Sequence, residues 1–290
     1  MTSEVYATDG VRLAVQVKGD EDATTIICVH GYPDDHTVWD GVVAALADEF
    51  RVVTYDVRGA GESGKPRKRS AYRLDQLESD LAAVVDAVSP DQPVHLLAHD
   101  WGSIQSWHAV TGDRLRGRIA SFTSISGPCL DHVGQWIRKN VCRPTVRGVR
   151  AMLRQLVFSA YIAFFHLPLI PELAWRRGWA ARVVSSLQRR TGDRGAGPPA
   201  LSDGVHGLAL YRANMLLRLV RPEERRAHLP VQVLAPVNDP FVSPALQQSV
   251  DWWVPDVRLR QVPGGHWLPR SNSTLVAART KEFIADFVCA

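Results

Sequence analysis

Short apolar runs alternate with amphipathic segments along most of the 290-residue chain. Residues 74–88 and 272–288 repeat apolar positions at helical spacing. Residues 11–18 alternate apolar and polar positions after an Asp9-Gly10 turn. Further strands are predicted at residues 25–29, 51–55, 94–98, 121–126, 231–237 and 257–262. Strands alternating with helices predict an α/β fold with a mostly parallel sheet covered by helices.

This alternation stops after Gly127-Pro128 and resumes at Val231. The segment between them shows helical patterns and no convincing strand. We therefore expect a core of residues 1–128 and 229–290, interrupted by a helical cap at residues 129–228. Inside the cap, residues 191–200 (TGDRGAGPPA) are rich in glycine and proline and predict a mobile loop.

Charge is unevenly distributed along the chain. Residues 129–228 hold 17 Lys and Arg against 6 Asp and Glu, whereas the whole chain has a net charge of only +4. Nucleic acid is a poor explanation, because no recognition motif or aromatic-interleaved basic stripe accompanies the charge. Two interpretations stay open: an arginine-rich solvated surface, or contact of the cap with an anionic membrane or substrate.

The cysteines and the N-terminus predict a cytoplasmic protein. The four cysteines show neither metal-ligand spacing nor the pairing of a secreted scaffold: Cys28, Cys129, Cys142 and Cys289. Residues 1–10 are acidic and polar where a signal peptide is basic and then apolar. The longest apolar run, residues 156–170, contains His166 and Pro168 and falls short of the roughly 20 residues of a membrane span.

The strongest chemical signal is Ala98-His99-Asp100-Trp101-Gly102, which joins a predicted strand to a predicted helix. Small residues on both flanks allow a sharp turn that presents the central side chain as a nucleophile. A carboxylate that attacks a saturated carbon forms an alkyl ester, which water can cleave, whereas attack on a carbonyl would give a labile anhydride. Asp100 therefore predicts an alkyl electrophile as substrate; its alternative role is a helix cap.

Three more motifs follow predicted strands. His30-Gly31-Tyr32-Pro33 predicts that the backbone N–H groups of Tyr32 and Trp101 form an oxyanion hole. Gly264-Gly265-His266-Trp267 places His266 as a general base on a loop at the same sheet edge. Asp239 is the expected carboxylate that orients this imidazole, with Asp131 as its rival.

The loop at residues 56–63 (DVRGAGES) resembles a phosphate loop only superficially. It lacks the Walker lysine, and no GxGxxG opens a helix there. We interpret it as a structural loop.

In this order, HGYP, DVRGAGESG, AHDWGS, NDP and GGHW resemble the α/β-hydrolase superfamily, specifically its epoxide hydrolase and haloalkane dehalogenase branch. The resemblance implies an eight-stranded sheet with a helical cap, nucleophile Asp100, base His266, acid Asp239 and no cofactor. In epoxide hydrolases two cap tyrosines hold the epoxide oxygen. The segments around Tyr161 and Tyr211 resemble the two that supply them.

The expected activity is epoxide hydrolysis, in which a small, lipophilic epoxide becomes a vicinal diol. A haloalkane dehalogenase is the nearest alternative, because the Trp101 indole could hold a halide, although some dehalogenases have Asn at the position of Tyr32. A β-lactone-processing relative and a catalytically silent binding module also stay open. The chain further resembles bacterial epoxide hydrolases followed by a short-chain dehydrogenase domain; whether a second domain follows here, and whether the protein forms a homodimer, stays open.

Overall fold

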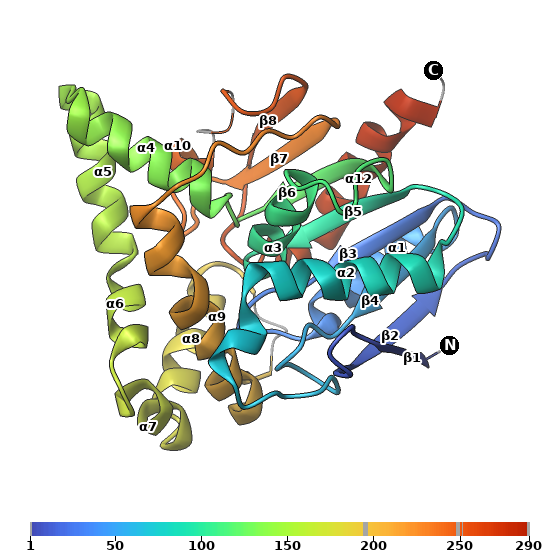
Figure 1. The fold of residues 1–290 in the computed structure, drawn as a ribbon, viewed down its shortest axis with the longest axis horizontal. Coiled ribbons are helices and arrows are strands. Elements are labelled where there is room, and N and C mark those ends of the chain that lie inside the picture. Colours follow the sequence, from blue (N-terminus) through green and yellow to red (C-terminus); the bar gives the residue numbers. More distant parts are fainter. Residues whose placement is uncertain (1, 194–196, 248–249, 251, 289–290) are drawn as a thin grey trace.

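The computed structural model describes residues 2–193, 197–247, 250 and 252–288. Their strands form one eight-stranded sheet in the order β1-β2-β4-β3-β5-β6-β7-β8 (Figure 1). The pairs β1–β2 and β2–β4 are antiparallel, and all later pairs are parallel. The strands are β1 (Thr2–Tyr6), β2 (Arg12–Lys18), β3 (Thr25–Val29), β4 (Arg51–Tyr55), β5 (Val94–His99), β6 (Ile119–Ile125), β7 (Val231–Pro236) and β8 (Val257–Val262). The predicted sheet is confirmed.

The centre of the sheet brings together segments that are distant in sequence. β3 and β5 are buried along their whole length, as expected for parallel strands covered on both faces. The chain adds β4 on one side of β3 and then returns to add β5 on the other, with Val29 opposite Ala98. The strand order reverses here, so the residues after β3 and β5 flank the crevice where open α/β sheets place their ligands.

Helices cover both faces of this sheet (Figure 1). α2 (Leu74–Val88) and α3 (Trp101–Val110) lie on one face, and α1 (Asp40–Leu46) and α12 (Ser273–Val288) lie on the other. The apolar positions of α2 that repeat at helical spacing are buried, which explains why its bounds follow from the sequence. α3 begins at Trp101, earlier than the start near Ser103 that the sequence suggests. Short helical turns complete the core: η1 (His36–Trp39), η2 (Arg69–Tyr72), α10 (Pro244–Gln247) and α11 (Leu268–Ser271).

The segment between β6 and β7 is helical wherever it has regular structure among its described residues. Its helices are α4 (Leu130–Cys142), α5 (Val146–Phe158), α6 (Ala160–His166), α7 (Ile170–Arg176), α8 (Trp179–Arg190) and α9 (Leu201–Val220). The apolar run 156–170 is divided between α5, α6 and the start of α7. In the part of the chain that is described, no helix is long and apolar enough to span a membrane. The loop predicted at 191–200 includes residues 194–196, which lie outside the described residues.

Two hydrogen bonds join this helical insertion to the core next to the crevice. The Asp203 carboxylate accepts from the Gly61 N–H at 2.9 Å, and the Tyr32 hydroxyl donates to the Gly204 carbonyl at 2.9 Å. Asp203 and Gly204 both lie in the first turn of α9. The start of α9 is therefore fixed against the loops that follow β3 and β4.

The loop at residues 56–63 is held by ion pairs of the buried Arg58, in agreement with a structural role. Arg58 is buried and donates to both oxygens of Asp80 at 2.5 and 2.6 Å. It also donates to both oxygens of Asp9 at 2.9 and 3.0 Å. Gly61 has a positive φ, and a Cβ there would lie 2.1 Å from the Asp56 carboxylate, so only glycine fits.

Replacing Arg58 by leucine should lower the free energy of unfolding by about 3–5 kcal/mol, because the buried Asp80 carboxylate loses its partner. Urea denaturation measures the change. Arg116→Leu is the matched control, since Arg116 pairs with Asp113 on the surface, where such pairs contribute roughly 0–1 kcal/mol. Equal effects of the two substitutions would show that the Arg58 pairs do not hold the loop.

Candidate active site

Asp100 lies at the sharp turn between β5 and α3. Its backbone has φ 50° and ψ −122°, a conformation that is rare and strained for a residue with a Cβ. Two glycines make room for the turn. A Cβ on Gly102 would lie 2.2 Å from the Val29 carbonyl oxygen, and one on Gly127 would lie 2.1 Å from the Asp100 carbonyl oxygen. The sequence motif therefore has glycine at position 102 because a larger side chain there would clash with the backbone of β3.

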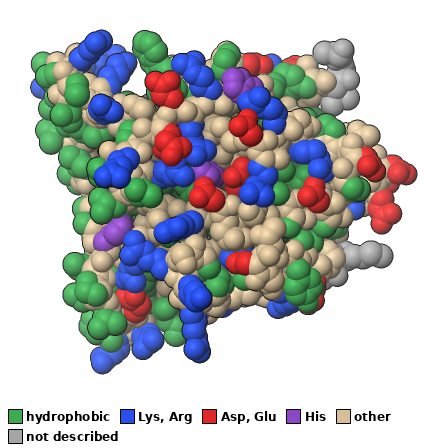
Figure 2. All heavy atoms as spheres, in the orientation of Figure 1, with side chains coloured by type: hydrophobic (Ala, Val, Ile, Leu, Met, Phe, Trp, Pro, Cys, Tyr) green, Lys and Arg blue, Asp and Glu red, His purple; other side chains and the backbone are tan. Residues whose placement is uncertain are grey.

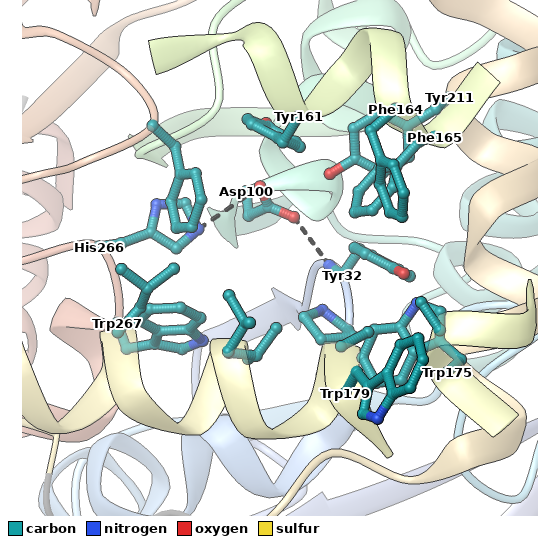
Figure 3. Close-up of a pocket in the computed structure, with 17 residues that line it drawn as sticks. Tyr32, Asp100, Tyr161, Phe164, Phe165, Trp175, Trp179, Tyr211, His266 and Trp267 are labelled. Carbon is teal, nitrogen blue, oxygen red and sulfur yellow. Dashed lines mark hydrogen bonds and ion pairs between the residues drawn. The ribbon is translucent and has the colours of Figure 1, made fainter. Parts of the chain in front are cut away.

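The Asp100 carboxylate is buried and held from two sides (Figure 3). Oδ1 accepts a 2.7 Å hydrogen bond from the Tyr32 N–H, and Oδ2 lies 3.5 Å from His266 Nε2. A Cβ on Gly31 would lie 2.4 Å from Oδ1 and 2.7 Å from the Trp101 nitrogen, so glycine lets the two loops meet. The predicted pair of backbone donors, Tyr32 and Trp101, thus borders the carboxylate.

His266 lies between two carboxylates. Its Nδ1 is 3.1 Å from Asp239 Oδ2, on the side opposite the Nε2 that faces Asp100. Asp239 is itself fixed, because its Oδ1 accepts from the N–H groups of Phe241 and Val242 at 2.8 and 3.1 Å. These contacts bring the three sequence-predicted residues Asp100, His266 and Asp239 into one line.

Asp131, the rival for the role of Asp239, is engaged elsewhere. Its Oδ1 accepts from the Glu223 N–H at 2.9 Å, and its Oδ2 lies 3.3 Å from Arg225. These contacts tie the start of α4 to the segment after α9. The geometry therefore favours Asp239 over Asp131 as the partner of the imidazole.

The arrangement stabilises opposite charges on Asp100 and His266. Burial by itself lowers the pKa of His266, but the nearby carboxylates of Asp239 and Asp100 outweigh it and raise the pKa to about 10. Burial raises the pKa of Asp100, but its hydrogen bond to His266 and the imidazolium charge hold it below the ordinary value. At neutral pH the site therefore holds an ionised Asp100 beside a protonated His266.

Two further polar residues support His266, and the sequence did not single them out. His99 Nε2 donates to the His266 carbonyl at 2.8 Å, and burial lowers the pKa of His99 to about 3, so its ring is neutral. Asp34 accepts from the Trp267 indole at 2.9 Å and lies 3.3 Å from Arg270. Asp34 directly follows the HGYP motif, but its partners are more than 230 positions away, which sequence reading could not connect.

A mostly apolar cavity of about 360 Å³ opens above Asp100, within the range of small-molecule sites. A second cavity of about 120 Å³ extends from Asp100 between α4, α5 and α9. Asp100, Tyr161, Tyr211 and Phe241 line both cavities. Asp100 thus lies where two apolar arms meet.

Tyr161 and Tyr211 come from α6 and α9 and meet across the cavity from His266 (Figure 3). Their ring centroids lie 6.0 Å apart, nearly perpendicular to each other. Burial, reinforced by the charge of Asp100, raises the pKa of both phenols. Both hydroxyls therefore stay protonated at neutral pH. The structure brings together all five side chains for which the sequence predicts catalytic roles.

An eight-stranded sheet of this order, with a nucleophile at the turn after β5, is the α/β-hydrolase fold. The family model described as alpha/beta hydrolase fold matches residues 24–141. The chain belongs to the α/β-hydrolase family.

Among proteins similar in sequence is the "Probable oxidoreductase EphD" of Mycobacterium tuberculosis, 35% identical over 293 residues and 98% of this chain. The alignment takes in 49% of that relative, so the chain spans about half its length. "Epoxide hydrolase A" of Mycobacterium tuberculosis is 31% identical over 71% of this chain and 61% of its own.

A solved structure of a Bacillus megaterium epoxide hydrolase with an inhibitor has a similar fold. The TM-score is 0.80 at 20% sequence identity, and the match covers 98% of this chain and 100% of that one. At this identity the likeness shows the shared fold alone.

The charge arrangement can be tested without a substrate. Asp100→Asn should lower the pKa of His266 from about 10, because one of its two facing carboxylates becomes neutral. NMR titration of ¹⁵N-labelled histidine side chains measures this, with His266→Gln identifying the resonance. Asp131→Asn, the matched control, should leave the titration unchanged.

The same titration has a stability consequence with a defined sign. The folded pKa of His266 lies above its ordinary value of 6.5, so its contribution to the free energy of unfolding is complete below about pH 6.5. It is lost as the pH rises through about 10.

If Asp131→Asn lowered the pKa of His266 and Asp100→Asn did not, the contacts of His266 described above would be contradicted.

Proposed function

We propose that this protein is an epoxide hydrolase that opens an epoxide to a vicinal diol through an alkyl ester on Asp100. The observation that carries the proposal is the buried Asp100 carboxylate with His266 on one side and Tyr161 and Tyr211 across the cavity from His266. The relatives named as epoxide hydrolases support it. Residues 129–228 act as the cap, and residues 1–128 and 229–290 form the hydrolase core.

In the first step an oxygen of Asp100 attacks a ring carbon and the bond from that carbon to the epoxide oxygen breaks. The departing oxygen is a strongly basic alkoxide. Tyr161 and Tyr211 are suited to hold it and donate a proton, because burial keeps both phenols protonated. Their position across the cavity from His266 separates the acid side of the site from the side where water attacks.

In the second step water attacks the carbonyl carbon of the ester. The N–H groups of Tyr32 and Trp101 stabilise the oxyanion, for which one such donor contributes about 3 kcal/mol. His266 activates the water, oriented by Asp239. Release of the diol regenerates the Asp100 carboxylate.

Ester formation itself converts His266 into a base. In the free enzyme its pKa is raised to about 10 partly by the charge of Asp100, which disappears when the carboxylate becomes an ester. His266 then loses its proton readily, and the tyrosine that gave its proton to the alkoxide needs one proton to become a phenol again. Proton release and proton demand therefore balance within the first half of the reaction.

The phenol pair favours this reaction over haloalkane dehalogenation, the second candidate. A halide leaves as a stable anion and needs no acid. The Trp101 ring, whose indole N–H would have to hold the halide, packs against Tyr211 with ring centroids 4.9 Å apart. A β-lactone substrate or a silent binding module likewise gives the two phenols no role.

The proposal also covers the substrate of the enzyme, its cellular location and the surfaces that it contacts. The substrate is a lipophilic epoxide, in keeping with the apolar cavity. The enzyme works in the cytoplasm, and its basic residues 129–228 contact anionic membrane surfaces. A homodimer through this segment is opposed by its excess of positive charge.

His266→Gln should stop the reaction after alkylation. Glutamine cannot take a proton from water, so ester hydrolysis should slow by roughly a hundredfold or more while ring opening proceeds. Intact-protein mass spectrometry after incubation with an epoxide should show the mass of one added substrate, and peptide mapping should place it on Asp100. An unmodified protein would contradict the proposed order of steps.

The double substitution Tyr161→Phe with Tyr211→Phe should abolish ring opening, because it removes both proton donors while keeping the ring packing. Diol formation under single-turnover conditions measures the loss, and the thermal midpoint should stay close to that of the unsubstituted protein. Tyr55→Phe, which removes a buried hydroxyl in the core, is the matched control and should retain activity. Diol formation at the unsubstituted rate by the double variant would refute the role of the phenols.

A further inference from the structure

An apolar surface lies uncovered along one rim of the helical insertion. We define the rim as residues 143–183, which include α5, α6, α7 and the start of α8. Among the described residues, eighteen large hydrophobic side chains are exposed, and ten of them lie in this rim: Val146, Leu153, Leu156, Val157, Leu167, Leu169, Ile170, Leu173, Trp179 and Val183. Such a concentration on one face is unusual for a monomer and marks an interaction surface.

Few side chains of the rim helices α5 and α6 are buried. Gln155 is the single buried side chain of α5, and α6 has none. α5 repeats apolar residues at helical spacing, a pattern that ordinarily faces a core, yet Leu153, Leu156 and Val157 are more than half exposed. These helices therefore carry an apolar stripe that the rest of the described chain does not cover.

The rim is also strongly basic. It holds seven arginines and no lysine, and all seven are exposed: Arg143, Arg147, Arg150, Arg154, Arg176, Arg177 and Arg182. Its one acid, Glu172, is paired with Arg212 of α9. Within the described residues none of the seven arginines forms a salt bridge. Figure 2 shows the result along the edge where α5, α6 and α7 lie in Figure 1: hydrophobic side chains with Lys and Arg interspersed.

Both arms of the cavity reach this rim. Trp179 and Val183 line the larger arm and are 57% and 60% exposed. Leu156 lines the smaller arm and is 56% exposed. The same side chains therefore belong to the wall of the cavity and to the outer surface. A lipophilic molecule that lies against the rim is already at the walls of both arms.

We propose that the rim docks on the surface of an anionic lipid bilayer, with its apolar side chains among the acyl chains and its arginines at the anionic headgroups, and that the lipophilic substrate enters from the bilayer. Exposed apolar residues beside unpaired cations are the features of an interfacial membrane contact. Docking does not depend on the reaction; the entry of substrate rests on the proposed function.

Other occupants fit the rim less well. Two copies of the rim would bring fourteen arginines together, so a homodimer through it is opposed by repulsion. Nucleic acid fits the charge but leaves the aliphatic side chains unused, because such interfaces are polar. An anionic bilayer satisfies both the apolar and the basic parts.

Co-sedimentation with vesicles tests the proposal. The protein should bind vesicles of phosphatidylcholine with roughly one quarter phosphatidylglycerol, should bind pure phosphatidylcholine at least about tenfold more weakly, and should lose binding as salt rises. Arg147→Glu, Arg150→Glu and Arg154→Glu together should reduce binding to the anionic vesicles by at least about tenfold. Leu153→Ser with Val157→Ser should also reduce it, since the apolar contribution is lost.

The matched control reverses the same number of charges on the core. Arg67, Lys68 and Arg69 are exposed and form no salt bridge within the described residues, and their triple substitution by glutamate should leave vesicle binding near the unsubstituted level. Equal loss in the control would overturn the rim as the docking surface, because net charge alone would explain binding. Equal binding to neutral and anionic vesicles, or a concentration-dependent dimer that the rim substitutions abolish, would also overturn it.

None of the substituted residues lines either cavity, so hydrolysis of a water-soluble epoxide separates this proposal from the proposed function. The rim variants should retain that activity, which also shows that they are folded. Vesicle binding without hydrolysis would leave docking intact and refute the reaction. Hydrolysis without vesicle binding would refute docking and leave the proposed reaction intact.

Discussion

The site depends on keeping a charged carboxylate out of water and still reactive. Asp100 is buried beneath an apolar cavity, where burial alone would raise its pKa and neutralise it. The imidazolium of His266 and the Tyr32 N–H compensate, and His266 is in turn held charged by Asp239. The charges of Asp100 and His266 therefore stabilise each other. Because these residues follow different strands, their alignment depends on the register of the whole parallel sheet.

The helical insertion supplies the two phenols and the apolar wall of the cavity, which the sheet edge does not provide. The sheet edge contributes charge and backbone donors, whereas α6 and α9 contribute the phenols, and α6, α7 and α8 contribute most of the apolar wall. The two parts are fixed together close to Asp100, through the hydrogen bond from the Tyr32 hydroxyl to the Gly204 carbonyl and the one from the Gly61 N–H to the Asp203 carboxylate. Tyr32 thus joins the two parts: its N–H holds Asp100, its ring packs on Tyr211 and its hydroxyl reaches α9. A change in the position of α9 would therefore be transmitted to Asp100 through Tyr32.

The helices of this insertion line the cavity on one side and leave an apolar, basic surface exposed on the other. α6 places Tyr161 toward Asp100, while the helices before and after it leave apolar side chains and arginines uncovered. A short helix that lines a cavity on one side has little left to pack against on the other. The exposed rim is thus a consequence of building a cavity from a single layer of helices, and the arginines on it determine what kind of surface can cover it.

The sequence by itself determined most of the elements and predicted the candidate reacting groups. Strands such as 25–29 and 51–55 and the helix 74–88 have the bounds that the pattern predicts, because their periodicity is set by local burial. Asp100 and His266 could be found because each sits in a short motif whose glycines have a steric reason. The sequence favoured Asp239 over Asp131, and the tertiary structure adds the distance that supports this choice, because Asp239 contacts His266 and Asp131 contacts Arg225. Tertiary structure alone decided the support of His266 by His99, the junction of the two cavity arms and the uncovered rim. These features depend on contacts between residues far apart in the chain, which no local pattern encodes.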